Sequence, residues 1–206
     1  MSKLLTYSIC LFFFSTYSYA KPGNTVIWLN GTTGSGDVKL DNTNYSVDLG
    51  GTSIQATFYS DNIYFTAGAG AADLTLAGVT ITSDSTMVGF GVNDGRVDYI
   101  TGTGESNSIG LTITDLEVTL GAYTSSETVT SIGYGGKFGL GDGVTFSFGV
   151  STDFEDFLTD NSYGASFIKS FGSALVSVGI DYNTYITDAR NSGNSTVLTL
   201  SIGTQF

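Results

Sequence analysis

Six charged residues are the candidates for chemistry in this sequence, because each falls on the polar side of a run in which apolar and polar residues alternate. Successive side chains of a strand point to opposite faces, so the polar residues of such a run face one way. If the strands surround an interior, Lys137 and Arg96 can pair there with the carboxylates, since buried charges are costly unless they are paired or hydrated. The six residues are Arg96, Asp98, Asp115, Glu117, Lys137 and Asp181.

A charged interior of this kind has two interpretations. The other inward positions are mostly Gly, Ser and Thr, whose small side chains leave room for a thin water-filled path. With four carboxylates against two cations among the six residues, such a path would weakly prefer cations. The alternative is a salt-bridged interior that conducts nothing.

The commonest catalytic side chain is missing, because the sequence contains no histidine. This removes the usual general base and the commonest metal ligand. A pair of carboxylates can act as acid and base, but the acidic residues are scattered, and solvated charge on loops is the simpler interpretation. Glycine pairs such as Gly68 and Gly70 lack the strand–loop–helix setting of a phosphate-binding loop. The sequence therefore predicts a protein that is not an enzyme and uses no metal or cofactor.

The composition restricts both partners and backbone structure. The net charge of −12 repels phosphate backbones, so no nucleic-acid partner is expected. The single proline is Pro22, and a long proline-free run suits a chain in which almost every backbone N–H belongs to a strand ladder. The single cysteine is Cys10, so the chain after the N-terminal segment has no thiol for a disulfide.

Residues 1–20 have the pattern of a secretory signal peptide. Lys3 supplies the positive start, residues 4–14 form a short apolar core, and Ser18-Tyr19-Ala20 places small residues where a signal peptidase cleaves. The core is too short to span a bilayer as an uncleaved anchor. A lipoprotein signal at Cys10 is rejected because Ile9, the residue before it, is large.

From residue 43 onward, short alternating runs separated by Gly, Asp, Asn and Ser clusters predict an all-β chain. The best count is about ten strands, and eight or twelve are the alternatives. Residues 43–59 are one strand bulged at Gly50-Gly51 or two strands, and residues 74–82 are a further candidate. Asn93-Asp94-Gly95 is a hairpin turn or a kink within residues 87–100. In residues 109–121, Leu116, Val118 and Leu120 would form the apolar, outward face.

The last eleven residues give the clearest strand. Leu198, Leu200, Ile202, Thr204 and Phe206 share one face, and the opposite face is small and polar. An alternating last strand that ends on an aromatic residue, after an export signal, resembles the C-terminal strand of bacterial outer-membrane β-barrels. Over residues 43–206 the chain resembles the small OmpA/OmpX-like and porin-like barrels.

The resemblance implies an antiparallel up-and-down transmembrane β-barrel in the cell outer membrane. Residues 21–42 would be a flexible periplasmic lead-in or a plug, and Phe206 would be part of an assembly signal read by the barrel assembly machinery. The barrel would be a monomer in contact with outer-membrane lipid and lipopolysaccharide. Its role would be structural and surface-binding, or the passage of small solutes as a porin does. The rival interpretation is a soluble secreted β-sandwich, such as an adhesin subunit.

Two further expectations concern the barrel surface. In the second half of the chain, turns alternate between short and long, which predicts short periplasmic turns and longer outer loops. Those loops would be acidic, with a contact surface at Phe154, Phe157 and Leu158. The acidic loop residues are Asp153, Glu155, Asp156, Asp160 and Asp188. The aromatic residues expected at the membrane interfaces are Tyr99, Tyr123, Tyr134, Tyr163, Tyr182 and Phe206.

Overall fold

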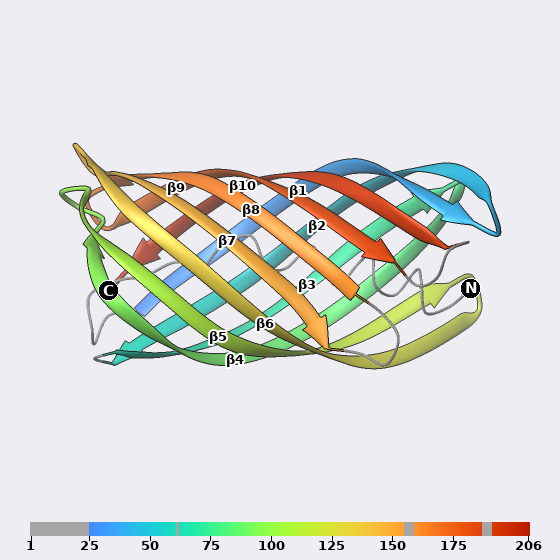
Figure 1. Ribbon diagram of the computed structural model, residues 1–206, viewed down its shortest axis with the longest axis horizontal. Coiled ribbons are helices and arrows are strands. Elements are labelled where there is room, and N and C mark those ends of the chain that lie inside the picture. The colour runs from blue at the N-terminus through green and yellow to red at the C-terminus, as the bar shows by residue number, and fades with distance from the viewer. Residues whose placement is uncertain (1–24, 61, 155–158, 187–190) are drawn as a thin grey trace.

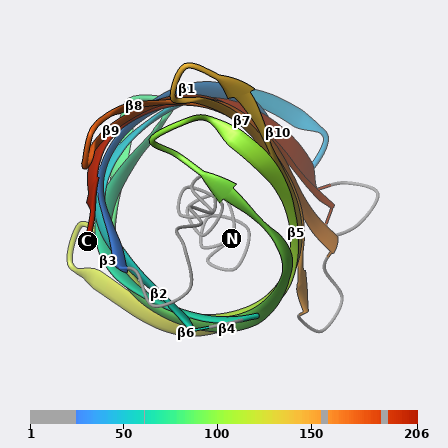
Figure 2. The same ribbon diagram turned by 90° about the vertical axis from the view of Figure 1, so that its left-hand side faces the viewer.

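The computed structural model describes residues 25–60, 62–154, 159–186 and 191–206, with the side chains of residues 154, 159 and 160 left out. The predicted signal peptide, residues 1–20, lies outside this range. The described residues form a closed barrel of ten antiparallel strands, each paired with the next, and β10 is paired with β1 (Figures 1 and 2). The strands are β1 (Thr25–Leu40), β2 (Thr43–Ser60), β3 (Ile63–Leu76), β4 (Val79–Asp98), β5 (Thr103–Leu120), β6 (Tyr123–Gly141), β7 (Val144–Phe154), β8 (Thr159–Phe171), β9 (Ala174–Ile186) and β10 (Ser192–Gln205). No helix in the described part of the chain is long and apolar enough to cross a membrane.

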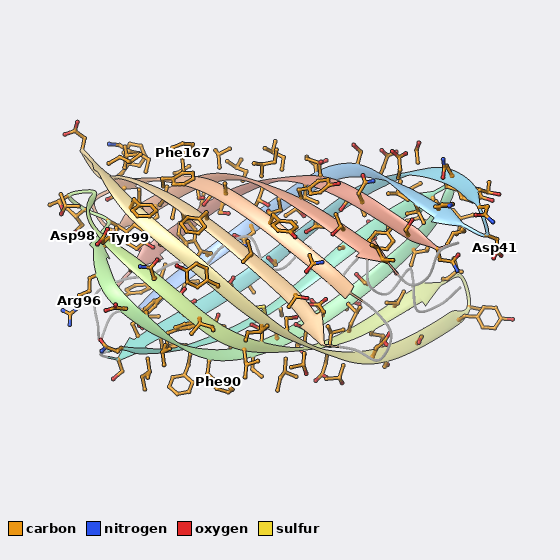
Figure 3. All side chains as sticks on the ribbon, in the orientation of Figure 1. Asp41, Phe90, Arg96, Asp98, Tyr99 and Phe167 are labelled. Atoms are coloured by element: carbon orange, nitrogen blue, oxygen red, sulfur yellow. The ribbon has the colours of Figure 1, made fainter. Side chains whose placement is uncertain are left out.

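The barrel closes where the first described residue meets the last residue of the chain. The Thr25 amide donates to the Phe206 carbonyl at 3.2 Å, and the Phe206 amide donates to the Thr25 carbonyl at 2.9 Å. The prediction of a ten-stranded up-and-down barrel is confirmed, and the two-layered sandwich is wrong. We call the end that holds Thr25 and Phe206 the terminal end, and the opposite end, where Asp41 lies (Figure 3), the distal end.

Strand β1 corrects the expected lead-in or plug. Residues 25–40 pair with β2 on one side and with β10 on the other, so residues 25–42 form a strand and its turn. The sequence does not predict this strand, because apolar and polar residues do not alternate in Asn30-Gly31-Thr32-Thr33-Gly34-Ser35-Gly36. Small polar residues of this kind are typical of loops, but they are also compatible with a strand whose two faces are both polar.

The outward side chains form an apolar belt around the barrel. Phe90 and Phe167 project outward from opposite sides of the ring (Figure 3) and are 54% and 57% exposed. Tyr134, Tyr163 and Tyr182 lie in one row, because Tyr134 pairs with Val150, Val150 with Tyr163, and Tyr163 with Tyr182. An outward apolar band bordered by aromatic residues is the lipid-facing surface of a transmembrane barrel. Other members of the belt are Leu29, Ile54, Phe58, Phe65, Val88, Val92, Ile109, Val178, Ile180, Leu198, Leu200 and Ile202.

Distal to this belt, the two faces of the wall exchange character. Leu116 and Val118 are buried inside, whereas Asp115 and Glu117 are exposed on the outside. The expectation that Leu116 and Val118 face outward is therefore wrong. A spanning strand needs roughly 9–11 residues, and β5 has 18, so its distal part stands in water, where the outer surface is polar. The inward apolar residues of this region include Val38, Val47, Leu49, Leu74, Ile81, Leu116, Val118 and Val129.

Three local expectations for the first half of the chain differ from the structure. Residues 74–82 are not a strand but contain the β3–β4 hairpin at Ala77 and Gly78. Of the two alternatives for Asn93-Asp94-Gly95, the hairpin turn is wrong and the position inside one long strand is confirmed, because these residues pair with residues 106–108 inside β4 and β5. Gly50 and Gly51 pair without interruption on both sides of β2, so residues 43–60 are one strand without a bulge.

From β6 onward the connections alternate in length, as predicted for this part of the chain, whereas the distal β5–β6 connection, residues 121–122, is short. β6–β7 and β8–β9 are joined at the terminal end by residues 142–143 and 172–173, and the distal connections span residues 155–158 and 187–191. Most of the predicted acidic loop, including Phe157 and Leu158, lies outside the described side chains, as does Asp188. Asp153 is not a loop residue, because it is buried in β7 and accepts a hydrogen bond from the Ser131 hydroxyl.

The β3–β4 hairpin contains a strained residue. Ala77 has φ of 50° and Gly78 has φ of 80°, the pair of positive values that a two-residue hairpin turn requires. Alanine pays about 1–2 kcal/mol for this left-handed conformation, which asparagine tolerates better. We expect Ala77→Asn to raise the free energy of unfolding by about 0.5–1 kcal/mol, measured by urea titration in lipid vesicles. Asp41→Asn in the β1–β2 turn is the control, because aspartate already tolerates its φ of 47°.

Candidate functional site

The six charged residues predicted to share an interior are not brought together. Lys137 and Asp181 face inward and are buried, whereas Arg96, Asp115 and Glu117 are exposed on the outer surface. Asp98 caps the β4–β5 connection at the terminal end, where its carboxylate accepts hydrogen bonds from the backbone amides of Ile100 and Thr101. Arg96 and Asp98 lie at the same end of the barrel (Figure 3).

The failed part of this prediction has one physical cause. Outward residues are apolar only where lipid touches the wall. Within the belt the apolar residues of a strand therefore face outward, whereas beyond the belt the apolar residues face inward. Arg96 is paired in register with the exposed Glu105 at the terminal rim, and Asp115 and Glu117 lie in the distal, water-facing part of β5. Lys137 and Asp181 belong to segments within the belt, where the parity rule holds.

At the terminal end, the interior is lined by an apolar and aromatic cluster. Its members are Val26, Trp28, Tyr59, Tyr64, Val97, Tyr99, Ile168 and Leu175. The Lys137 ammonium donates a hydrogen bond of 2.9 Å to the Tyr99 hydroxyl and lies 5.6 Å from the centre of its ring. Tyr99, expected in an interfacial girdle, is instead 1% exposed inside the barrel. Its phenol provides the polar end that a buried ammonium needs.

Small polar side chains line the middle of the barrel. The Asn30 amide donates to the Ser53 hydroxyl at 2.9 Å, the Gln55 amide donates to the Thr66 hydroxyl at 3.0 Å, and many of the remaining inward positions are Gly, Ser or Thr. Eight strands already enclose an interior just wide enough for side chains to fill. A ten-stranded wall encloses more, and serine and glycine are too small to fill it. The described inward side chains in the middle of the barrel are therefore small and polar, and most of them are buried.

Two large inward side chains, Tyr64 and Trp28, lie along the wall over glycines. A Cβ atom at Gly110 would overlap the Tyr64 hydroxyl, and one at Gly91 would meet the same ring at 2.5 Å. Tyr64 therefore extends from β3 across β4 to β5, along the inner surface. The Trp28 ring lies over Gly203 in the same way, and its Cε3 atom would stand 2.6 Å from a Cβ there. Because glycine has no side chain, it leaves space on the wall for an aromatic ring to pack, as it does in other sheets.

Several buried polar atoms on this inner surface make no hydrogen bond within the described residues. Such atoms are rare in folded proteins unless water satisfies them, and a site lined by several of them suits water. These atoms are Asn30 Oδ1, Asn93 Oδ1, Ser106 Oγ, Thr114 Oγ1, Thr145 Oγ1, Asn183 Oδ1 and Ser201 Oγ. The described part of the chain contains no group of three or more His, Cys, Asp or Glu side chains that could hold a metal ion.

Comparison with known proteins supports the fold. No family model and no curated protein sequence matches the chain. Among solved structures, it is similar to the translocator domain of the autotransporter NalP from Neisseria meningitidis, with a TM-score of 0.51 and 13% identity over 100% of this chain and 94% of that one. It also matches the transport unit of the autotransporter AIDA-I from Escherichia coli (TM-score 0.48, 9% identity, 100% and 98% coverage). A third match is an outer membrane channel from Pseudomonas putida F1 (TM-score 0.48, 6% identity, 92% and 98% coverage).

At these identities the first match shows the fold alone, and the lipid-facing belt described above indicates where that fold resides. A closed barrel satisfies all its backbone groups internally, which is the condition for a β-structure to cross a bilayer. The chain is therefore an outer-membrane β-barrel protein.

Proposed function

We propose that the barrel is a passive conduit for small solutes across the outer membrane and that it catalyses no reaction. One observation carries the proposal: the middle of the interior is lined by small polar side chains, while Tyr64 and Trp28 lie flat over glycines. A pore needs an interior that its own side chains leave unfilled, and small inward residues together with rings that lie along the wall support this proposal.

The lining favours small solutes of low charge. Apolar clusters at both ends flank the polar middle, and an apolar lining slows strongly hydrated ions more than small neutral solutes, although ions in concentrated salt still pass. A small organic solute with one or two polar groups can shed water at the ends and hydrogen-bond to serine and threonine hydroxyls in the middle.

Recording in planar bilayers tests the proposal. We expect discrete conductance steps from the purified protein in concentrated KCl. Ser177→Trp should reduce the step size, because Ser177 faces inward and is 3% exposed. Val178→Trp is the matched control, because its side chain faces outward and is 49% exposed, so its conductance should equal that of the original protein. Folding of both variants is checked by the shift in gel mobility on heating, and the absence of steps from the folded protein would reject the conduit.

A second candidate, surface binding, is favoured by the distal part of the wall. Strands β2, β4, β5 and β6 have 18, 20, 18 and 19 residues, so they continue past the bilayer with a polar outer face. Contact with outer-membrane lipid and lipopolysaccharide, a monomeric state and delivery by the barrel assembly machinery through Phe206 belong to either candidate. The exposed Phe206 ring, 71% accessible at the terminal end, supports the last of these.

A further inference from the structure

Two hollows on the outer surface of the barrel join into one groove. The first lies over β3–β6 and has a volume of about 340 Å³, and the second lies over β5–β8 and has a volume of about 320 Å³. Ile109 and Ile132 line both hollows, so the two are continuous. Each volume falls in the range of sites that bind small organic molecules.

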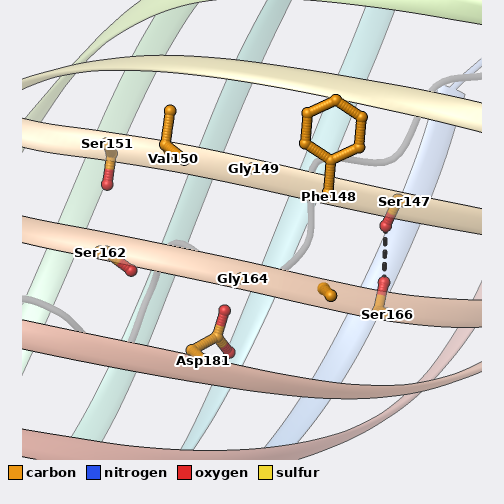
Figure 4. A pocket seen from close by; sticks show the side chains of 10 residues that line it. Ser147, Phe148, Gly149, Val150, Ser151, Ser162, Gly164, Ser166 and Asp181 are labelled. Atoms are coloured by element: carbon orange, nitrogen blue, oxygen red, sulfur yellow. Dashed lines mark hydrogen bonds between the residues drawn. The ribbon is translucent and has the colours of Figure 1, made fainter.

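Two rows of outward side chains form the walls of this groove, because residues paired in register on neighbouring strands lie side by side. Phe90 projects outward from one wall (Figure 3). Val150 belongs to the other wall, and it projects from β7 away from Ser151, whose side chain faces the interior (Figure 4). The wall nearer the terminal end consists of Ile63, Val92, Ile109, Tyr134, Val150 and Tyr163, and the wall nearer the distal end consists of Phe65, Phe90, Leu111, Ile132, Thr152 and Asn161.

Tyr134 is held away from the middle of the groove. Its hydroxyl donates a hydrogen bond of 3.0 Å to Asn107 Oδ1, and its ring centre is 6.3 Å from that of Phe148. Asn107 and Phe148 both pair with Gly136, which is two residues nearer the terminal end than Tyr134. These two contacts draw the ring toward the terminal side, so the space between Tyr134 and Ile132 stays open.

The groove rises from the terminal end toward the distal end. It begins at Ile63, the first residue of β3, and reaches Tyr163, close to the distal start of β8 at Thr159. Six strands spaced by about 4.8 Å extend over about 24 Å. With a strand tilt of about 35–45°, a groove that runs across the strands rises by about 14–17 Å. This is half of the hydrocarbon core of about 30 Å, so the groove has the depth of one leaflet.

The two ends of the groove differ in polarity. The walls of the hollow over β3–β6 carry only aliphatic and phenyl groups, whereas the distal end presents Thr152, Asn161 and Tyr163. None of the described residues that line the groove is charged, and the distal outer surface carries the exposed carboxylates of Asp115 and Glu117. The distal end therefore offers no cation to a phosphate, but its neutral amide and hydroxyl groups can exchange hydrogen bonds with other hydroxyls.

We propose that this groove binds one acyl chain of a glycolipid from the distal leaflet, with the sugar headgroup at Thr152, Asn161 and Tyr163. The groove is continuous with the lipid-facing belt, so hydrocarbon covers it in the membrane. Walls on both sides and polar groups at one end hold a chain in a single place and orientation, unlike the lipid that covers the rest of the belt. The site lies on the outer surface and does not depend on the proposed conduit.

Native mass spectrometry of the folded protein in lauryldimethylamine oxide micelles tests the site. The probe is a monoglucosyl diacylglycerol, and phosphatidylglycerol with the same acyl chains is the comparison lipid. We expect one glycolipid per barrel, bound in a saturable way and at least several-fold more tightly than phosphatidylglycerol. Ile109→Trp fills the part of the groove that both hollows share and should weaken glycolipid binding by about tenfold or more. Leu111→Trp blocks the same groove with an independent substitution.

Val178→Trp is the matched control, because Val178 also faces outward within the belt but does not line the groove, so it should leave binding unchanged. Thr152→Val keeps the shape of the side chain and removes its hydroxyl. It should weaken glycolipid binding by about two- to tenfold, the usual effect of one hydrogen bond, and leave phosphatidylglycerol unaffected. The shift in gel mobility on heating verifies that each variant is folded.

The outcomes separate the groove from its occupant. Adducts that do not saturate, or that persist equally in Ile109→Trp and Leu111→Trp, overturn the site. Equal binding of the two lipids, lost in both tryptophan variants, overturns the assignment of a sugar headgroup. Conductance from the folded protein bears on the conduit alone, because a chain held on the outer surface does not pass through the interior.

Discussion

Replacing Phe90 with arginine is expected to lower the free energy of unfolding by about 2–4 kcal/mol, the cost of a cation on the lipid face near the middle of the bilayer. Phe90 faces outward from β4 and is 54% exposed. Its neighbours in register are Phe65 and Leu111, so no water-facing side chain adjoins it. The measurement is a urea titration of the protein in lipid vesicles, followed by the fluorescence of Trp28, the only tryptophan.

Thr82→Arg provides the matched control on the same strand. Thr82 also faces outward, but it pairs with Asp73 and Thr119 in the distal, polar part of the wall. A surface substitution of this kind changes stability by about 0.5 kcal/mol or less. Equal destabilisation by the two arginines would contradict the exchange of polarity along β4, and with it the placement of the bilayer.

Gly110→Ala is expected to destabilise the barrel by about 1–3 kcal/mol, the usual cost of overpacking. The new Cβ atom would overlap the Tyr64 hydroxyl and would lie 2.9 Å from Tyr64 Cζ and 3.0 Å from the Phe90 carbonyl oxygen. The Tyr64 ring must then move away from Gly110 and turn into the interior. In a conducting protein, the same change should reduce the conductance step.

A double-mutant cycle isolates this contact. Tyr64→Ala removes the ring, and Gly110→Ala added to that variant should cost about 0.5 kcal/mol or less, so the two substitutions should couple by about 1 kcal/mol or more. Gly50→Ala is the control for placing alanine in a strand, because the nearest atom to its Cβ would be the Thr32 carbonyl oxygen at 3.9 Å. If the losses in the free energy of unfolding are additive in the cycle, the Tyr64 ring does not pack against Gly110.

The sequence predicts the fold correctly where contact with lipid makes every second residue apolar. Leu198, Leu200 and Ile202 alternate with small polar residues and are 51%, 57% and 57% exposed on the outer surface, as predicted. The ten strands and the alternation of turns in the second half follow from the same signal. β1 is not predicted because its Gly-rich middle, residues 30–36, has small or polar residues on both faces, so the sequence shows no apolar periodicity there.

The interior is harder to predict, because a single parity rule does not hold along a whole strand. Lys137 and Asp181 face inward as predicted, whereas Asp115 and Glu117 lie beyond the point where the outer surface becomes polar. Nor could spacing reveal that Tyr64 rests on Gly91 and Gly110, since these residues belong to three different strands. Glycine recurs at inward positions of the sequence. This recurrence indicates where aromatic rings can pack on the wall only when the strand register is known.

The hydrogen bonds between Thr25 and Phe206 join an early strand of the chain to its last strand, so the ring closes only after β10 has been made. Segments separated by nearly the whole chain must meet, and contacts of such high sequence separation form slowly. Until the final residues arrive, the partial sheet keeps two unpaired margins that hydrocarbon cannot solvate. An insertion pathway that shelters both margins until they zip together is therefore a requirement of this architecture, and the seam between β1 and β10 is where newly made chains are most vulnerable to misassembly.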